Sequence, residues 1–423
     1  MDEQSIYKEL CERESYFPLK YVLRDIELSD WQSIDLAKIL YNKKSLLAYD
    51  TGLGKTLMAS AFMYRVLNIN RDKKFIFIGK LDQIRDTPKK IENATGLVVR
   101  VLDAKESSLD SLIMSDDNYH ILFITVDTLN SIKHMETLFK MRNNFIGVIL
   151  DEVHEYCNYK KSYNGMMLES LTYNFKYVLG LSATPLNSSE EQLYSILRIV
   201  NQIEFPNDRV CRKLIKENSY KMRCSLIVRE REKNLHNGIL VPIQPMEHQM
   251  TANGVNAVCT VKGDGAWAQL VSLVKLIKSR KGEQVLVYIN RKEIYSVVSQ
   301  VLTHEGISHG IVNGDTKNKD LIRDRFRSRK FDVLLTNSTT SLDIQCDYIV
   351  FYELTMDVKQ FIGRAERGLD SKELDVYFFV TCKTFEVRFF FDKIYNRAFD
   401  VERVLGKDYS EVICVGDLLK EME

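Results

Sequence analysis

One segment of the sequence has the residue types and spacing needed to hold a chain of phosphate groups. It reads Ala48-Tyr-Asp-Thr-Gly-Leu-Gly-Lys-Thr56 and lies between a short apolar run and a helical stretch. Glycines let backbone N–H groups approach phosphate oxygens, the lysine reaches the terminal phosphates, and the threonine hydroxyl can bind Mg²⁺. An accidental glycine-rich turn is the competing interpretation, but the adjacent lysine and threonine argue against it. The residues expected to surround the phosphates are Gly52, Leu53, Gly54, Lys55 and Thr56, with Thr56 also a metal ligand.

A pair of carboxylates forms the second candidate group. The apolar run Val148–Leu150 leads directly into Asp151-Glu-Val-His154. Asp151 is expected to hold Mg²⁺, and Glu152 to orient and deprotonate an attacking water, because phosphoryl transfer needs mainly positioning and charge neutralisation. By itself this pattern could be a solvated acidic turn. Its place after a buried strand and downstream of a phosphate loop favours catalysis.

Short β-branched and aromatic runs alternate with helical stretches on both sides of these motifs, which is the pattern of a parallel sheet. The first series of expected strands is 45–49, 75–78, 97–102, 121–125, 148–150 and 177–181. The second series is 285–289, 309–312, 333–336, 348–352 and 376–380. Residues 186–267, which include three of the prolines, read as helices plus a crossing segment. We therefore expect an α/β protein whose parts are an N-terminal lobe (1–190), a helical connecting region (191–265) and a C-terminal lobe ending in a helix (266–423).

Composition limits the class of protein. At 423 residues, 45% hydrophobic and 28% charged, the chain is expected to fold throughout as more than one domain. The eight cysteines form no C-x-x-C pair, so neither a zinc ribbon nor a disulfide framework is indicated. No apolar run approaches the roughly 20 residues that span a bilayer, and the first 15 residues are too acidic for a signal peptide. We expect a cytoplasmic protein, and the net charge of +1 leaves its partners to be inferred from motifs.

These motifs resemble those of the superfamily 2 helicases and translocases, whose DEAH-like box is similar to Asp151–His154. Gly180-Leu-Ser-Ala-Thr-Pro185 resembles the family's motif III, and Leu28-Ser-Asp-Trp-Gln32 resembles the segment whose glutamine recognises adenine. The strict phosphate-loop motif has glycine where this chain has Tyr49, but many superfamily 2 proteins also depart from it there. The resemblance implies two RecA-like P-loop domains with parallel sheets flanked by helices, and ATP and Mg²⁺ as cofactors. By the same resemblance, Gln32 binds the nucleotide, and the residues that couple the nucleotide site to nucleic acid are His154, Ser182 and Thr184.

In the C-terminal half, Gln360-Phe-Ile-Gly-Arg-Ala-Glu-Arg367 resembles motif VI of the family. The resemblance makes Gln360 a nucleotide-binding residue and Arg364 and Arg367 candidate arginine fingers, whose spacing places both on one face of a helix. Two such arginines alone would be interpreted as solvated surface. The motif V region at 337–344 precedes them at the expected distance, although it has Thr340 and Ser341 where the family usually has glycines.

Several further residues occupy positions that contact nucleic acid in the family. Hydroxyl and basic side chains at strand ends suit phosphate contacts, which position a protein without reading base sequence. The candidates are Lys80, Thr125, Arg291, Thr339 and Thr340. The basic cluster at 323–330 is instead interpreted as the solvated face of an amphipathic helix, because Leu321, Ile322 and Phe326 form its apolar side.

Within superfamily 2, the segment 226–233 and Leu240-Val-Pro242 resemble the region before the second lobe of Swi/Snf-type translocases. The expected function is an ATP-dependent motor, most similar to a minimal Swi/Snf-type translocase of phages or bacteria, that acts on duplex or branched DNA as a monomer. Two alternatives stay open. One is an RNA helicase, and the other is an ATP-gated nucleic-acid-binding subunit with little turnover.

Overall fold

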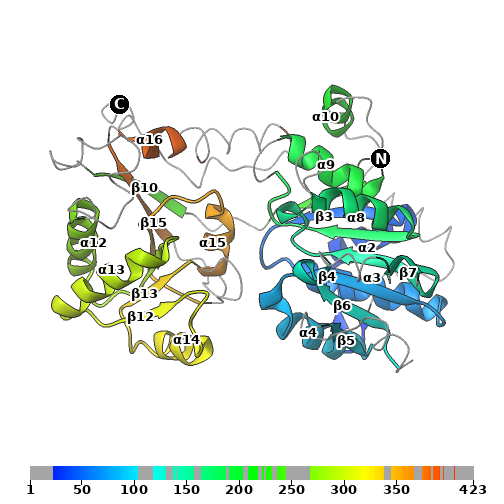
Figure 1. Cartoon of the computed structure of the whole chain (residues 1–423), viewed down its shortest axis with the longest axis horizontal. Coiled ribbons are helices and arrows are strands. Elements are labelled where there is room, and N and C mark those ends of the chain that lie inside the picture. The colour runs from blue at the N-terminus through cyan, green and yellow to red at the C-terminus, as the bar shows by residue number, and fades with distance from the viewer. Residues whose placement is uncertain are drawn as a thin grey trace. The chain divides into compact units, whose positions relative to one another are not determined.

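The computed structural model describes most of both halves of the chain (Figure 1). The described residues are 22–102, 118–129, 136, 138–140, 142–156, 163–186, 190–202, 208–217, 222, 225–230, 236–243, 267–337, 344–365, 374–382, 384–390, 394 and 404. The chain forms two compact units, Met1–Arg231 and Glu232–Glu423. Each is described separately below.

The first unit is built on a seven-stranded parallel sheet in the order β5-β6-β4-β7-β8-β3-β9. Its strands are β3 (Lys44–Tyr49), β4 (Lys74–Gly79), β5 (Val99–Leu102), β6 (Ile121–Thr125), β7 (Phe145–Leu150), β8 (Tyr177–Leu181) and β9 (Leu226–Arg229). A small antiparallel hairpin of β1 (Val22–Leu23) and β2 (Ile26–Glu27) precedes them. The helices are α2 (Asp30–Asn42), α3 (Lys55–Ile69), α4 (Asp86–Thr95), α6 (Val126–Leu129), α8 (Tyr163–Tyr173), α9 (Glu190–Asn201) and α10 (Asp208–Lys216). Single 3-10 turns are η1 (Leu81–Gln83), η2 (Arg142–Asn144) and η3 (Val153–Glu155).

Both faces of this sheet are covered by helices, which explains why its inner strands β4, β6 and β7 are almost entirely apolar. Leu47 and Tyr49 of β3 belong to a core cluster with apolar residues of α2, α3 and α4. On the opposite face, a Cβ at Gly180 would lie 2.8 Å from Val200 of α9, so glycine is needed for that helix to approach β8. The sheet is thus held rigidly between two helical layers, and the loops at its carboxyl edge are positioned by it.

The second unit contains a six-stranded parallel sheet in the order β10-β15-β14-β11-β13-β12. The strands are β10 (His236–Ile243), β11 (Val285–Tyr288), β12 (His309–Val312), β13 (Val333–Thr336), β14 (Tyr348–Phe351) and β15 (Leu374–Thr381). The helices are α12 (Trp267–Ser279), α13 (Lys292–His304), α14 (Lys319–Arg327), α15 (Val358–Ala365) and α16 (Phe385–Phe389). Alternate residues of β11 enter different core clusters, since Leu286 and Tyr288 pack in one while Val285 and Val287 pack in the other. Helices therefore cover both faces here as well.

The structure confirms the α/β class and every expected strand, with some bounds moved by one to three residues. It adds β9 and β10, which the expectation of helices and a crossing segment for 186–267 did not include. Strand β10 contains Gly238 and Pro242, which weaken the strand pattern, and it lies at an edge of its sheet, where proline is tolerated. The helix expected to end the chain lies largely outside the described residues beyond α16.

The structure also bears on the basic helix and on the cysteines. In α14 the side chain of Phe326 is buried, and Arg323 and Arg327 pair with Asp320 and Asp324, but Leu321, which was expected on the apolar side, is exposed because the helix packs on its sheet through Phe326. The described cysteines, Cys211, Cys346 and Cys382, are buried thiols outside any disulfide. Within the described part of the chain, no helix is both long enough and apolar enough to cross a membrane.

Candidate nucleotide site

The phosphate loop joins the end of β3 to the start of α3. Gly52 and Gly54 have φ values of +87° and +82°, in the left-handed region that side chains disfavour. A Cβ at Gly52 would meet nothing within 4 Å, so the backbone there faces open space. Lys55 begins α3, and its Nζ donates to the carbonyl oxygen of Tyr49 at 3.2 Å. The two glycines thus lead directly into the N-terminus of α3, where backbone N–H groups and the helix dipole favour an anion.

Gln32, the expected adenine-recognition residue, lies against this loop. Its Nε2 donates to the carbonyl oxygen of Leu53 at 3.4 Å. Its Oε1 accepts from the backbone N–H of Ser29 at 3.0 Å, and the Ser29 hydroxyl accepts from the backbone N–H of Gln32. This reciprocal pair is a capping box that starts α2. The cap therefore fixes Gln32 beside the phosphate loop.

The two carboxylates follow β7 and are almost fully buried, with exposed fractions of 5% for Asp151 and 4% for Glu152. The backbone N–H of Asp151 donates to the carbonyl oxygen of Ile78 in β4 at 2.9 Å, which fixes the turn to the neighbouring strand. Burial, and next the negative charge of Glu152, raise the pKa of Asp151 to about 7, while Lys55 and Lys80 act in the opposite direction. The nucleotide-free protein therefore holds a carboxyl group that a nearby cation would stabilise in its charged form.

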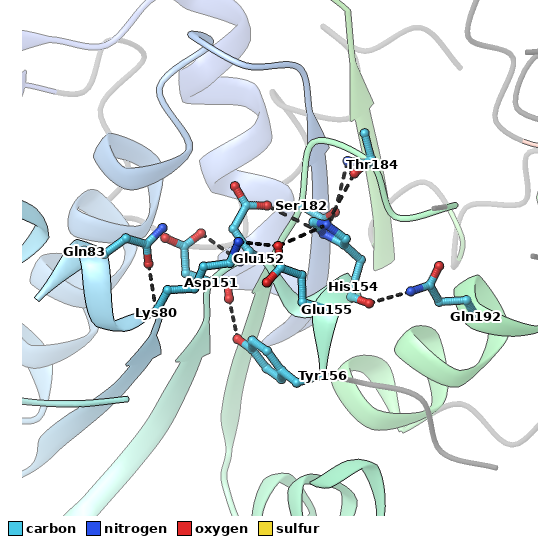
Figure 2. Close-up of polar contacts among 10 residues, drawn as sticks. All are labelled: Lys80, Gln83, Asp151, Glu152, His154, Glu155, Tyr156, Ser182, Thr184 and Gln192. Carbon is cyan, nitrogen blue, oxygen red and sulfur yellow. Dashed lines mark hydrogen bonds and ion pairs between the residues drawn. The ribbon is translucent and has the colours of Figure 1, made fainter. Parts of the chain in front are cut away.

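The three expected coupling residues are in contact with one another (Figure 2). A hydrogen bond of 2.8 Å joins His154 Nδ1 to the Ser182 hydroxyl, and His154 Nε2 lies 3.5 Å from the Thr184 hydroxyl. The Ser182 hydroxyl also accepts from the backbone N–H of Thr184 at 3.1 Å. His154 Nδ1 is 3.6 Å from a carboxylate oxygen of Glu152. A continuous polar path thus leads from the Glu152 carboxylate to the loop after β8.

Sequence reasoning missed two residues of this path. Gln192, on α9, donates from its side chain to the carbonyl oxygen of His154, and Glu155 pairs with Lys80 (Figure 2). No motif marks Gln192, because it lies on a helix that reaches the site only through packing. Glu155 directly follows the DEAH-like box and could have been suspected from its charge alone.

The expected nucleic-acid contacts that the structure describes are each held by other residues of the protein. Lys80 forms an ion pair with Glu155. Thr125 is buried, and its hydroxyl is 2.8 Å from that of Thr128. Arg291 forms an ion pair with Glu353, whose carboxylate also accepts from the Arg291 backbone N–H at 2.9 Å.

The remaining candidate residues belong to the second unit. Gln360 and Arg364 lie on α15, so the expected helix is present, but their side chains lie outside the described residues. Arg367, Thr339 and Thr340 also lie outside the described residues.

The residues of the first unit fit a nucleotide bound with Mg²⁺. Among the described residues, no three His, Cys, Asp or Glu side chains group together as a metal cage. Mg²⁺ commonly uses one or two protein oxygens together with phosphate oxygens and water. The Asp151 carboxylate and the Thr56 hydroxyl offer such a set. The pKa of Asp151, raised by burial, is consistent with a site that a cation completes.

Family models match both units. Residues 24–187 match the model described as type III restriction enzyme, res subunit, and residues 268–371 match the helicase conserved C-terminal domain. Chromodomain-helicase-DNA-binding protein 9 of Mus musculus is 25% identical over 201 residues, covering 43% of this chain and 7% of that protein. The uncharacterized ATP-dependent helicase YqhH of Bacillus subtilis is 23% identical over 200 residues, covering 47% of this chain and 33% of YqhH. The chain thus spans a third or less of the length of these relatives.

A solved structure of low sequence identity shares the fold. S. cerevisiae Dbp5 bound to RNA and ADP BeF3 aligns with a TM-score of 0.55 and 15% identity, over 92% of this chain and 90% of that one. The Sulfolobus solfataricus SWI2/SNF2 ATPase core in complex with dsDNA aligns with a TM-score of 0.43 and 12% identity, over 95% and 98%. Because the two family models together match more than half of the chain, the chain belongs to the superfamily 2 helicases and translocases.

Proposed function

We propose that the chain is an ATP-dependent motor that moves along or remodels nucleic acid. One observation carries this proposal: the candidate groups follow three adjacent parallel strands of the first sheet. The phosphate loop follows β3, Ser182 and Thr184 follow β8, and the carboxylate pair follows β7, with the strands in the order β7-β8-β3. Ligands of open α/β sheets bind at the carboxyl ends of the strands, so this common edge supports a single nucleotide site.

In this proposal each group has one task in hydrolysis. Gly52, Gly54 and the N-terminus of α3 bind the phosphates through backbone N–H groups, and Lys55 moves from the Tyr49 carbonyl to the terminal phosphates. When bound, Mg²⁺ neutralises charge on the phosphate oxygens, with Asp151 and Thr56 as its protein ligands. Glu152 orients the attacking water and accepts its proton.

The polar path from Glu152 through His154 to Ser182 and Thr184 is proposed to couple turnover to the polymer. A change in the charge around Glu152 alters its 3.6 Å contact with His154, and His154 is hydrogen-bonded to Ser182. Because all four residues of the path are buried, a shift at one end is passed to the other with little solvent screening. Arg364 and Arg367 are proposed to stabilise charge in the transition state, and Gln360 to contact the nucleotide.

Duplex or branched DNA is the proposed polymer, because the relatives reported above include chromodomain-helicase-DNA-binding proteins. An RNA helicase is the second candidate, since the neighbour with the higher TM-score, Dbp5, was solved bound to RNA. An ATP-gated binding subunit with little turnover is the third. Lys80 and Arg291 are proposed phosphate contacts, as are Thr125, Thr339 and Thr340.

The test is the ATPase rate with no polymer, duplex DNA, branched DNA, single-stranded DNA and RNA, with Lys55→Ala as the blank. Stimulation mainly by duplex or branched DNA would support the DNA motor. Stimulation mainly by RNA or by single strands would replace it with a helicase, and equal rates in the parent and in Lys55→Ala would refute the nucleotide site. If nucleotide binds through Lys55 but no polymer raises the rate, the chain is a gated binding subunit.

A further inference from the structure

A buried carboxylate that no helicase motif includes lies behind the phosphate loop. Asp35, on α2 one turn after Gln32, has an exposed fraction of 0%. Its Oδ2 accepts from the Tyr49 hydroxyl at 2.7 Å and from Arg229 Nε at 2.8 Å. Its Oδ1 accepts from Arg229 Nη2 at 2.8 Å and from Lys38 Nζ at 3.4 Å. We call Asp35, Tyr49 and Arg229 the Asp35 cluster.

The cluster joins three separate elements of the first unit. Asp35 lies on α2, Tyr49 is the last residue of β3, and Arg229 is the last residue of the edge strand β9. Trp31 packs against two members of the cluster. Its ring meets the Tyr49 ring edge-on, with the ring centres 5.5 Å apart, and the Arg229 guanidinium carbon lies 5.7 Å from the centre of the Trp31 ring. Asp35 and Arg229, which are 194 positions apart in the chain, are thus held together directly.

Both residues that lead into the glycine loop are tied to this cluster. The carbonyl oxygen of Tyr49 accepts from Lys55 Nζ at 3.2 Å, while its hydroxyl is held by Asp35. The backbone N–H of Asp50, the next residue, donates to the carbonyl oxygen of Arg229 at 3.0 Å. The start of the loop is therefore fixed by side-chain and backbone bonds to the same arginine network.

The chemistry of the cluster favours a positioning role over a contribution to stability. A buried ion pair gains little net stability because desolvation of both charges offsets their attraction, but its bidentate hydrogen bonds fix distances and angles closely. Apolar side chains of similar volume would stabilise the fold at least as much. The charged cluster instead fixes the register of β3, β9 and α2 at the point where the nucleotide is proposed to bind.

We infer that Asp35, Tyr49 and Arg229 are positioning residues that hold the phosphate loop and Lys55 in the geometry that receives ATP. The inference rests on the proposed function of the loop. It also accounts for the tyrosine at position 49, where the strict phosphate-loop motif has glycine: the phenol group reaches back to Asp35, and a glycine there would leave Asp35 without this partner.

The test uses Tyr49→Phe, which keeps the ring and removes one hydroxyl. A matched control is Tyr295→Phe, because Tyr295 is equally buried in the second unit and its hydroxyl also gives one hydrogen bond, 2.7 Å to the carbonyl oxygen of Ile289. Nucleotide Kd is measured with a fluorescent adenine nucleotide at a temperature where thermal denaturation shows both variants folded. Steady-state KM and kcat are measured alongside.

We expect Tyr49→Phe to raise the nucleotide Kd and the KM for ATP by roughly fivefold or more, since loop displacements well below 1 Å are costly at such sites. Tyr295→Phe should leave both unchanged. Arg229→Lys keeps the positive charge but loses the bidentate hydrogen bond to Asp35. It should therefore raise the nucleotide Kd as Tyr49→Phe does. If both variants at the cluster bind nucleotide like Tyr295→Phe, the cluster serves structure only and the inference is overturned.

Failure of this inference is distinguishable from failure of the proposed function. Lys55→Ala reports on the function, because it removes the proposed phosphate contact itself. Weak nucleotide binding in Lys55→Ala with normal binding in Tyr49→Phe would reject the positioning role alone. Normal binding in Lys55→Ala would reject the nucleotide site and the inference with it.

Discussion

The buried carboxyl group of Asp151 makes the stability of the nucleotide-free protein depend on pH in a predictable direction. Its folded pKa of about 7 exceeds the ordinary aspartate pKa of 3.8. Between these values the folded state keeps a proton that the unfolded state has lost, so the free energy of unfolding falls as pH rises and levels off above the folded pKa. Asp151→Asn removes this dependence, because an amide carries no charge at any of these pH values.

The magnitude follows from the two pKa values. One pKa unit corresponds to about 1.4 kcal/mol, so the stability of Asp151→Asn relative to the parent should rise by about 2 to 3 kcal/mol between pH 5 and pH 8. The variant should also lose ATPase activity, because its amide oxygen is a weaker Mg²⁺ ligand than a carboxylate.

The assay is urea denaturation at pH 5, 6, 7 and 8 with EDTA present and no nucleotide. The chain has two tryptophans, Trp31 in the first unit and Trp267 in the second, so a Trp267→Phe background lets fluorescence report on the first unit alone. Asp25→Asn is the control, because Asp25 lies on an exposed turn and its charge stays in water. A stability difference for Asp151→Asn that is the same at pH 5 and pH 8 would refute the reasoning.

Three further changes test the neighbouring contacts. Glu152→Gln should abolish turnover while nucleotide Kd stays within about threefold of the parent, because the amide cannot accept the proton of the attacking water; a normal kcat would contradict its role as base. Ser182→Ala removes the 2.8 Å contact with His154 and should reduce polymer stimulation of the ATPase more than the basal rate, whereas equal losses would argue against coupling. Glu155→Gln frees Lys80 from an ion pair and should tighten polymer binding at low salt by roughly threefold, with the difference shrinking as salt rises; unchanged affinity in titrations would exclude Lys80 as a phosphate contact.

The groups at the strand ends were predictable from sequence, while those that reach the site through packing were not. Asp151 and Lys55 follow apolar runs that the sequence identifies as buried strands. Because parallel strands end at the same edge of a sheet, the sequence also predicted that both residues lie at that edge. Asp35 lies in the middle of an ordinary helical stretch, and its partner Arg229 lies on a strand of four residues that is too short for a clear alternating pattern. Gln192 likewise depends on how α9 packs, which no local pattern specifies.

The edge position of β9 has a practical consequence for dividing the chain into fragments. This strand forms parallel pairs with β3 from Leu46 to Tyr49. A fragment ending at residue 190 would leave the backbone N–H and C=O groups of β3 open along that edge, a template for intermolecular pairing and aggregation. It would also leave Asp35 buried without its arginine. A fragment extended through residue 230 keeps β9 paired with β3 and Arg229 paired with Asp35. We therefore expect this longer fragment to stay monomeric during recombinant expression.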